Sequence, residues 1–515
     1  MNTKHSFFIM FLMSILIINL HSQNIIIEDE LDNTAFQNEF NKSFPESIFE
    51  IKDSKILIWY DNFDRGGMTN EHIFRLMDKE LKEIKRNVQT LPEKVYINGL
   101  FQLKNKNILA IIYKEVSNNS IELYCTQFNT NTLALETKNM NYIGLFEVKS
   151  RFGIRSLIRS GDLFRIISNE TSNYLGVVSN ASIIATENAK LNYHVLDADG
   201  KILKSGIYDF GVFKKYINIQ NYLISNTGNI YTLAQDDTED KWTAGKTFLV
   251  NLNNNTKVEF GKDFKALNLP GLSLSGSKII ILSTYSEDRK DALRGSAQGI
   301  FLGVLDDNTG KVIMEKSFKF SQETLDSLYM GNKRKSKTGN IYNGKILRLL
   351  KETSPDKFIF VLEDRNIIQS SNGRFSSTDY TSGSAICCQL SIKNAEVDWI
   401  TAVNKYEFST AYNYVGTFSY LDKAGELNLL MNVSKVRPVK ATGQVMYWNV
   451  NLRKAVLTNL HITPTGVKSA VKLLNTKKDL GYYFVCTNTY QDVHSGNIYF
   501  ILRNGKKELV AMIPR

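Results

Sequence analysis

The sequence is poor in the residues that mark flexible or cross-linked proteins. Its 515 residues include only 4 cysteines, 7 prolines and 31 glycines. So few cysteines in so long a chain do not form a disulfide framework, and the shortage of proline and glycine argues against long linkers. Cys125, Cys387, Cys388 and Cys486 each lie in an apolar run, so we expect buried free thiols. Export would permit one disulfide, between partners that the sequence does not identify.

The sequence also lacks the local signatures of common enzymes. It contains 6 histidines, and the patterns HExxH, GxSxG and CxxC do not occur. A serine or cysteine nucleophile with a nearby histidine therefore has no local sequence signature. No glycine-rich loop is present to hold a phosphate. We expect no cofactor and no bound metal, and we name no catalytic residue.

Long hydrophobic runs are absent except near the N-terminus. Phe7 to Leu20 is apolar, follows Lys4 and precedes Ser22 and Gln23. The alternative, a membrane anchor, would need about 20 apolar residues, whereas this run has the shorter h-region length of a signal peptide. We predict that residues 1–23 are removed. The mature protein would then be soluble, without a transmembrane segment, and periplasmic or secreted.

The formal net charge is +11 at pH 7. An exported protein rarely meets nucleic acid, so we do not expect a nucleic-acid partner. An anionic glycan, lipid headgroups or an acidic protein fit a basic surface better, although such a charge also serves solubility alone.

The sequence does contain a recurring pair of hairpins. Turn-forming residues separate two apolar runs in LDDNTGKVI from Leu305, LDADGKIL from Leu196 and LNNNTKVEF from Leu252, and less clearly near Leu76, Phe128, Ile392, Asn451 and Leu502. A second hairpin precedes each one, as LSLSGSKIIILSTY from Leu272 precedes the first and as VKLLNTKKDLGYYFVC, Val471 to Cys486, begins the last unit. The acids of DDNTG could suggest a calcium loop, but the bidentate Glu of such a loop is missing. We interpret these segments as tight turns.

Eight such units fill residues 48–515, at about 58 residues each. Repeated four-stranded sheets of this kind form a β-propeller. We therefore predict an all-β fold with eight four-stranded antiparallel blades over residues 48–515, preceded by an N-terminal extension over residues 24–47. A β-solenoid is the less favoured alternative. Residues 69–88 carry a helical pattern of apolar residues, but the repeat places the third and fourth strands of the first blade there.

Loop lengths distinguish the two faces of the predicted ring. Turns between strands one and two, and between three and four, are short, and we call their side the short-turn face. Connections between strands two and three, such as Glu363 to Ser384, and between blades, such as Ser321 to Lys345, are long. We call their side the long-loop face. Insertions that gather on one face usually mark the binding face.

The long-loop face carries the candidate binding residues. They comprise carboxylates with adjacent arginines, aromatic side chains and a basic run. The residues are Asp236, Asp237, Trp242, Tyr285, Glu287, Asp288, Arg289, Glu363, Asp364, Arg365, Arg374, Phe375, Tyr380, Tyr490, Lys333, Arg334 and Lys335. The carboxylates could cap strand ends, bind a sugar, or cleave a glycosidic bond as an acid/base pair. The aromatic side chains could stack on a glycan or anchor a protein.

Two turns resemble the repeat of a known family. DDNTGKVIMEK from Asp306 and KNAEVDWITAV from Lys393 are similar to the Asp-x-x-Thr-Gly-Lys-x-x-Trp repeat of eight-bladed quinoprotein-type propellers. That family includes pyrroloquinoline quinone dehydrogenases and non-catalytic outer-membrane assembly factors. Only Trp399 occupies the tryptophan position, and Met314 stands there in the other turn. Some of the dehydrogenases carry a vicinal disulfide, which Cys387 and Cys388 would match. The resemblance touches two units, so it implies the architecture more than the cofactor.

The sequence thus favours an exported, monomeric, non-catalytic binding or scaffolding propeller. Its partner would be an envelope protein complex or an anionic glycan, met on the long-loop face. The alternatives are a carbohydrate-active enzyme that uses the carboxylates and a quinoprotein-like oxidoreductase.

Overall fold

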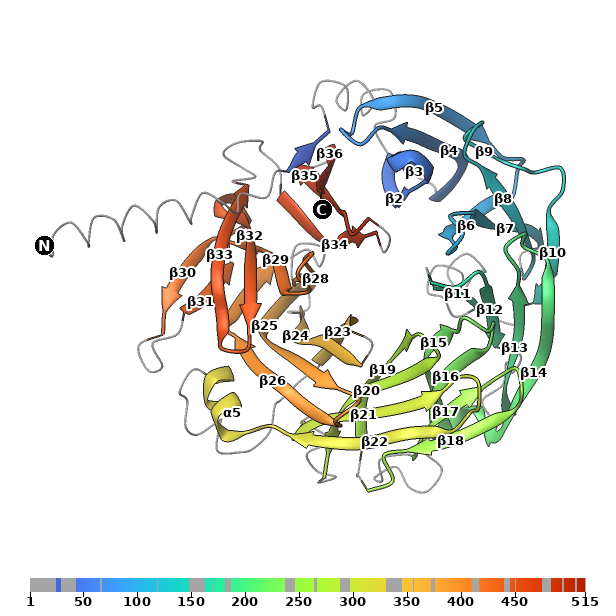
Figure 1. Ribbon diagram of the computed structural model, residues 1–515. Coiled ribbons are helices and arrows are strands. Elements are labelled where there is room, and N and C mark those ends of the chain that lie inside the picture. Colours follow the sequence, from blue (N-terminus) through green and yellow to red (C-terminus); the bar gives the residue numbers. More distant parts are fainter. Residues whose placement is uncertain are drawn as a thin grey trace, which may run out of the picture.

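The computed structural model describes residues 25–28, 43–64, 67–117, 119–147, 163–169, 171–180, 187–236, 246–263, 266–287, 297–329, 345–354, 356–371, 376–409, 416–439, 445–449, 451–474, 483–492, 495–504 and 507–514. These residues form eight antiparallel sheets arranged in a ring, with one strand of each sheet nearest the central axis (Figure 1). The predicted eight-bladed β-propeller is confirmed.

Each blade has four strands, counted from the axis outward. The innermost strands are β2 (Ser43–Glu50), β6 (Val95–Gln102), β11 (Phe164–Ser168), β15 (Ile217–Ile224), β19 (Ala266–Ser275), β23 (Lys345–Ser354), β28 (Phe418–Leu421) and β34 (Tyr483–Gln491). The second strands are β3 (Ile56–Asp64), β7 (Ile108–Ser117), β12 (Leu175–Asn180), β16 (Ile230–Asp236), β20 (Lys278–Ser286), β24 (Lys357–Ser371), β29 (Leu427–Val433) and β35 (Ile498–Asn504).

The third strands are β4 (Gly67–Met77), β8 (Ser120–Asn129), β13 (Asn188–Leu196), β17 (Lys246–Asn251), β21 (Gly299–Asp306), β25 (Ser376–Ser391), β32 (Val456–Thr463) and β36 (Lys507–Ile513). The outermost strands are β5 (Glu83–Thr90), β10 (Asn141–Glu147), β14 (Ile202–Phe213), β18 (Thr256–Phe260), β22 (Val312–Lys319), β26 (Glu396–Val403), β33 (Gly466–Leu474) and β1 (Ile26–Ile27). A short strand, β9 (Ala134–Leu135), also pairs with β8.

The hydrophobic core is divided among the blade junctions. Eight clusters of buried side chains each join two neighbouring blades. Second strands such as β20 are buried along nearly their whole length, because both faces of a blade pack on neighbours. One blade alone would expose both apolar faces, so the ring is the unit that folds.

The ring is closed by the N-terminal segment. β1 pairs with β36, so residues from the predicted N-terminal extension supply the fourth strand of blade eight. The Glu28 backbone N–H donates to the Val510 carbonyl at 3.0 Å and continues the pairing. Because the first and last parts of the chain share one sheet, opening the ring requires breaking that pairing.

Residues 69–88 form strands, as the repeat predicts and the helical pattern does not. β4 and β5 lie there, joined by a tight turn in which Leu81 has φ 60°. The DDNTG segment is also a hairpin turn. The Asp306 carboxylate accepts the Thr309 N–H at 2.7 Å, and Gly310 has a φ of 68°, which glycine adopts without strain.

The predicted strand order is wrong in blades seven and eight. Asn451 to Leu457 was expected to hold a turn between strands three and four. Instead a 3-10 turn, η5 (Leu452–Lys454), leads into the third strand β32. Val471 to Cys486 was expected to begin blade eight, but it ends blade seven with β33 and starts blade eight with β34. The error begins at residues 445–449, whose strand resembles the third strand of blade seven but pairs in the sheet of blade six. The shifted count still ends at the C-terminus because the N-terminus supplies the fourth strand of blade eight.

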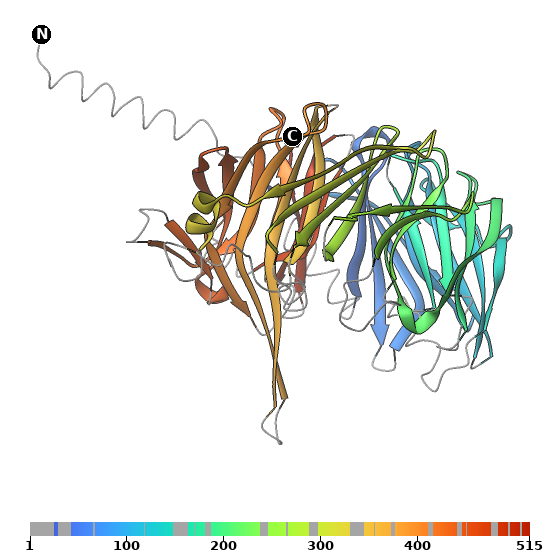
Figure 2. The same cartoon turned by 90° about the horizontal axis from the view of Figure 1, so that it is seen from below.

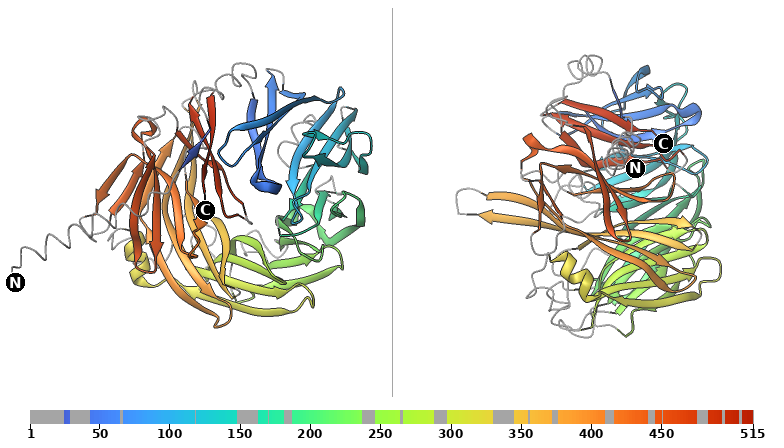
Figure 3. Two further views of the ribbon diagram at one scale, coloured as in Figure 1. Left: turned by 45° about the horizontal axis from the view of Figure 1, so that its top comes forward. Right: turned by 60° about the vertical axis from the view of Figure 1, so that its left-hand side comes forward.

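Blade six departs from the simple pattern. Glu363 to Ser384 was expected to be a long loop, but most of it continues β24 and β25 as a paired hairpin. This hairpin projects well beyond the body of the ring (Figure 2). Three more strands extend its sheet: β27 (Lys405–Ser409), β31 (Val445–Asn449) and β30 (Lys435–Pro438). We call β30, β31, β27 and the part of the hairpin beyond Glu363 the platform (Figure 3).

A short helix lies between blades five and six. α5 (Gln322–Leu328) begins after Ser321, whose hydroxyl accepts the Thr324 N–H at 3.1 Å as an N-cap. Leu325 and Leu328 are buried in the cluster between these blades. The sequence was interpreted as an inter-blade loop here, because a seven-residue helix is too short to show a clear period.

Candidate functional site at the junction of blades six and seven

The predicted binding residues are dispersed over the ring. The structure describes the side chains of Asp236, Tyr285, Glu287, Glu363, Tyr380 and Tyr490. Asp364 and Arg365 lie on the β24 backbone, with side chains outside the described part. Outside the described residues are Asp237, Trp242, Asp288, Arg289, Lys333, Arg334, Lys335, Arg374 and Phe375.

Several of the described candidates have structural contacts. The Tyr285 ring is only 2% exposed and packs between blades four and five. Glu287 is exposed and lies 3.9 Å from the Lys319 ammonium. Tyr490 lies on β34, beside the connection between strands one and two of blade eight, so it is on the short-turn face. Its predicted place on the long-loop face followed from the wrong strand order.

Glu363 lies where the platform leaves the ring. The pairing of β24 with β25 shifts between Glu363 and Arg365, which marks a β-bulge. At the same level the partner of β25 changes from β26, which ends at Val403, to β27, which starts at Lys405. Bulges re-aim side chains, and here Glu363 and Lys405 are brought into contact.

Lys405 contacts three acceptors in this cluster. Its ammonium nitrogen lies 2.7 Å from Glu363 Oε1 and 2.8 Å from Glu407 Oε2, and it donates to the Ser382 hydroxyl at 2.5 Å. All three charged side chains are 0% exposed. The cluster therefore holds one cation between two acidic groups in a site that excludes water.

The next blade contributes hydrogen-bond donors to the same carboxylates. Thr417, just before β28, donates to Glu363 Oε1 from its N–H at 2.9 Å and from its hydroxyl at 2.8 Å. The Gly416 N–H donates to Glu407 Oε2 at 2.8 Å. The other oxygen of Glu407 is buried and has no hydrogen-bond partner among the described residues. The cluster thus connects the platform to the inner strand of blade seven.

Burial and the charge of neighbouring groups have opposite effects on the pKa values of Lys405 and Glu407. Burial by itself lowers the pKa of Lys405, but Glu363 and Glu407 outweigh it, so the pKa of Lys405 is raised. Burial raises the pKa of Glu407 above its usual range, against the charge of Lys405. The two carboxylates thus favour the protonated form of Lys405, while burial favours the protonated form of Glu407.

Sequence reasoning missed Lys405, Glu407, Ser382 and Thr417. A usable signal was present, because Lys405 and Glu407 lie two apart, next to aromatic residues, in the strand KYEFS and so face the same side of it. Charged residues in such a strand are rarely buried unless they are paired.

Sequence reasoning also missed two sites in which one carboxylate accepts hydrogen bonds from three side chains of a neighbouring blade. We call each of these sites a carboxylate clamp. Asp307 of blade five accepts hydrogen bonds from Thr227, Asn229 and Tyr231 of blade four, at 2.7–3.1 Å. Glu50 of blade one accepts them from Ser495, Asn497 and Tyr499 of blade eight, also at 2.7–3.1 Å. The signal is the pentapeptide TGNIY at 227–231 and SGNIY at 495–499; TGNIY also occurs at 338–342, outside the described residues. Both clamps join neighbouring blades on the short-turn face.

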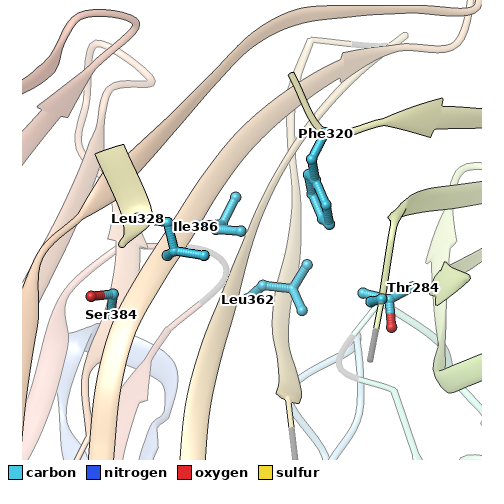
Figure 4. Close-up of a pocket in the computed structure, with 7 residues that line it drawn as sticks. Thr284, Phe320, Leu328, Leu362, Ser384 and Ile386 are labelled. Atoms are coloured by element: carbon cyan, nitrogen blue, oxygen red, sulfur yellow. The ribbon is translucent and has the colours of Figure 1, made fainter. Parts of the chain in front are cut away.

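The small cavity between blades five and six is too small to bind a ligand. It measures about 10 Å³ and is lined mainly by apolar side chains, including Phe320, Leu328, Leu362 and Ile386 (Figure 4). That volume admits roughly one water. We interpret it as a packing gap beneath α5.

One group of described residues could offer ligands to a metal ion. Ligand atoms of Asp422, Glu426 and His461 lie within 4.8 Å of one another on the short-turn face. The Asp422 carboxylate accepts the N–H groups of Ala424 and Glu426, at 2.9 Å each. We therefore assign Asp422 to the turn between β28 and β29.

The cysteines are free where the structure describes them. Cys125, Cys387 and Cys388 are buried thiols, so the vicinal pair is not a disulfide here. Burial raises the pKa of Cys125 to about 12 and also raises the pKa values of Cys387 and Cys388 well above the usual value of a thiol. The Cys486 side chain lies outside the described part.

Comparisons with known proteins give no family assignment. No protein-family model matches the sequence, and no curated protein matches it. Among the described residues, no helix is long and apolar enough to cross a bilayer.

Solved structures that resemble this chain include puromycin hydrolase, at 8% identity and a TM-score of 0.34 over 76% of this chain and 50% of that chain. This chain thus spans about half the length of that protein. The β-propeller domain of the Trilobed protease from Pyrococcus furiosus is 9% identical over 85% of this chain and 97% of that domain, with a TM-score of 0.35. An α-L-arabinofuranosidase from Fusarium graminearum is 10% identical over 73% and 98%, with a TM-score of 0.32. Similarities as weak as these say nothing about the activity of this chain. Its sheet topology identifies it as an eight-bladed β-propeller.

Proposed function

We propose that this chain is an exported, non-catalytic binding or scaffolding propeller, monomeric by itself. It docks a protein or glycan partner on its long-loop face, as an accessory subunit of a complex in the cell envelope. The platform is the observation that carries this proposal. Its two hairpin strands contain 15 and 16 residues, about twice the length of most other strands in the ring.

A binding surface benefits from a rigid base, and the platform has one. β27 pairs with β25, and Lys405 on β27 lies in the buried cluster with Glu363 and the blade seven donors. An extension anchored in this way keeps its shape when it meets a partner, which reduces the entropy lost on binding. Proteins place binding residues on loops and extensions held by a rigid scaffold.

The competing function, glycoside hydrolysis by long-loop carboxylates, needs an acid and a base that both reach a sugar. Glu363, one of the carboxylates on which that function would depend, is 0% exposed and ion-paired. It is therefore unavailable as the acid in an open cleft. This burial supports binding over hydrolysis.

The test is affinity purification of the protein from its native envelope fraction, followed by mass spectrometry. Gln369 pairs with Thr378 in the hairpin, so residues 370–377 can be replaced by an Asn-Gly turn without disturbing β27. We expect the wild type to enrich a partner and the shortened hairpin to lose it. Lys423→Ala, on an exposed short turn, is the matched control and should retain the partner.

Two results would contradict the proposal. The first is a partner that stays bound after the hairpin is shortened but is lost in the Lys423→Ala control. The second is turnover of an envelope polysaccharide by the purified protein that Glu287→Gln abolishes, since that result would establish the hydrolase.

A further inference from the structure

We propose that the buried cluster forms a covalent cross-link: Lys405 and Glu363 condense to an amide, with loss of one water. The bond would join β27 to β24 at the base of the platform. This inference concerns the chemistry of the cluster and does not depend on what the platform binds.

The nucleophile is already in place. Lys405 Nζ lies 2.7 Å from Glu363 Oε1, so the carboxyl carbon bonded to that oxygen lies within about 4 Å of Nζ, close to the separation of reacting atoms in a near-attack arrangement. The β-sheet holds both side chains, and neither is exposed. Two groups fixed in this way react as if at very high concentration, because little translational or rotational freedom remains to be lost.

The electrophile is polarised by the neighbouring blade. The Thr417 N–H and hydroxyl both donate to Glu363 Oε1. Attack on the carboxyl carbon develops negative charge on this oxygen, and two fixed donors stabilise that charge, as in an oxyanion hole. Oε1 therefore remains as the amide oxygen, and Oε2 is the oxygen that leaves. This arrangement favours Glu363 over Glu407 as the group that joins Lys405.

Glu407 is placed to move the protons. Its Oε2 lies 2.8 Å from Lys405 Nζ, within reach for proton transfer. Glu407 first takes a proton from the ammonium and passes it to Glu363, which leaves a neutral amine facing a carboxylic acid. The amine attacks and a C–N bond forms. Glu407 then takes a second proton from the nitrogen and gives it to the departing Oε2, the C–O bond breaks, and water leaves.

The atoms and charges balance in this sequence. One ammonium and one carboxylate become one amide and one water, and Glu407 returns to its starting state. No oxidant, reductant or other reactant is needed. The buried Lys405–Glu363 ion pair, which costs desolvation free energy, becomes a neutral amide, and Glu407 Oε2 keeps the Gly416 N–H as a hydrogen-bond donor.

The experiment is peptide mapping of the purified, fully unfolded wild-type protein. Trypsin cuts after unmodified lysine and arginine, so an unlinked chain yields the separate peptides Phe358–Arg365, Asn394–Lys405 and Tyr406–Lys423. The cross-linked chain should instead yield Phe358–Arg365 joined to an uncut Asn394–Lys423, lighter by one water. The partly exposed pair Lys278–Asp356, also 2.7 Å apart, is the internal control and should remain unlinked.

Two variants test the roles of Glu407 as the proton carrier and of Lys405 as the nucleophile. Glu407→Gln keeps the size of the side chain but removes the proton carrier, so we expect folded protein with unlinked peptides. Lys405→Arg keeps the charge and should also be unlinked. Complete cleavage after Lys405 in the wild type would overturn the proposal, whether or not the variants fold. Loss of water within Asn394–Lys423 alone would overturn the choice of Glu363, and full linkage in Glu407→Gln would overturn the role of Glu407.

Discussion

The junction between blades eight and one and the junction between blades six and seven both bury a basic side chain among acidic ones. In the first, Arg75 lies 2.6 Å from Glu28 and 2.6 Å from Glu83. In the second, Lys405 lies between Glu363 and Glu407. Each junction places one buried cation between two carboxylates, although Arg86 also contacts Glu83 in the first. The buried cation is an arginine in the first and a lysine in the second.

That difference changes what each junction can do. Arginine presents a planar fork of donors and does not lose its proton in proteins, whereas lysine can become a neutral nucleophile. Arg75 also donates to the Tyr60 hydroxyl at 3.1 Å, so it holds three groups at the seam where the ring closes. Similar burial of charge can therefore clasp a ring at one junction and prepare a covalent bond at another.

We call the contacts of Arg75 with Glu28, Glu83 and Tyr60 the arginine clasp. Its removal is expected to have the largest effect on stability. Arg75→Ala leaves Glu28 buried without its cation, and breaking a buried pair in this way costs about 3–5 kcal/mol of unfolding free energy. Denaturant unfolding measures the loss, and hydrogen exchange at β36 reports whether the ring opens. Arg75→Lys, which retains the charge, should cost less. A loss below about 1 kcal/mol for Arg75→Ala would show that the clasp does not hold the ring.

The lysine cluster should behave as a cross-link. Lys405→Arg preserves a cation but cannot form the amide, so unfolding free energy should fall by about 2–4 kcal/mol, as for loss of a cross-link that closes a comparable loop. Equilibrium unfolding of the two proteins measures this. A Lys405→Arg variant as stable as the wild type would indicate that ionic contacts alone hold the platform.

The two carboxylate clamps offer a matched comparison of junctions without buried cations. Tyr231→Phe and Tyr499→Phe each remove one hydroxyl that donates to a buried carboxylate, at 2.8 and 2.7 Å. Each should lower unfolding free energy by about 1.5–3 kcal/mol. Because each clamp uses the same three kinds of donor, a small hydroxyl, an Asn amide and a Tyr hydroxyl, costs that differ strongly between the two variants would contradict their equivalence.

The arginine clasp should also weaken in acid. Burial by itself would raise the pKa of Glu83, but hydrogen bonds and charge from Arg86 and Arg75 outweigh it and lower the pKa. A lowered folded pKa stabilises the fold above the unfolded pKa of about 4.3. That contribution is lost as pH falls through the folded value. Stability measured from pH 6 downward should therefore fall less in Glu83→Gln than in the wild type, and equal slopes would contradict this.

Glu287 should be nearly neutral to stability. Its side chain is exposed and lies 3.9 Å from the Lys319 ammonium, a surface pair of the kind that contributes little. Glu287→Gln should change unfolding free energy by less than about 0.5 kcal/mol. A larger loss would indicate contacts that this account does not include.

The fold was largely predictable from the sequence because it is carried by local signals. Turn residues and alternating apolar strands recur along the chain, and the repeat correctly overruled the helical pattern at residues 69–88. The strand order failed in the last two blades, because no local signal assigns β31 to the sheet of blade six or pairs Ile26 and Ile27 with β36 at the far end of the chain. The hairpin of blade six was taken for a loop because its polar segment resembles one.

The candidate site was predicted far less well. Glu363 was selected for a position next to a long connection, and it does lie at the base of the platform, but its partners come from distant segments. Lys405 is 42 residues further along the chain (405 minus 363), and Thr417 belongs to the next blade. Only the bulge in blade six and the packing of two blades bring these residues together. Such contacts depend on tertiary structure and leave almost no pattern in the sequence.

The mass of the intact, denatured chain tests the contrast between the two junctions most directly. Wild type and Lys405→Arg are compared with the masses calculated from their own sequences after N-terminal processing is determined. The account predicts that the wild type is lighter than calculated by one water and that the variant is not. A wild-type chain at its full calculated mass would show that the lysine junction is an ion cluster like the arginine one.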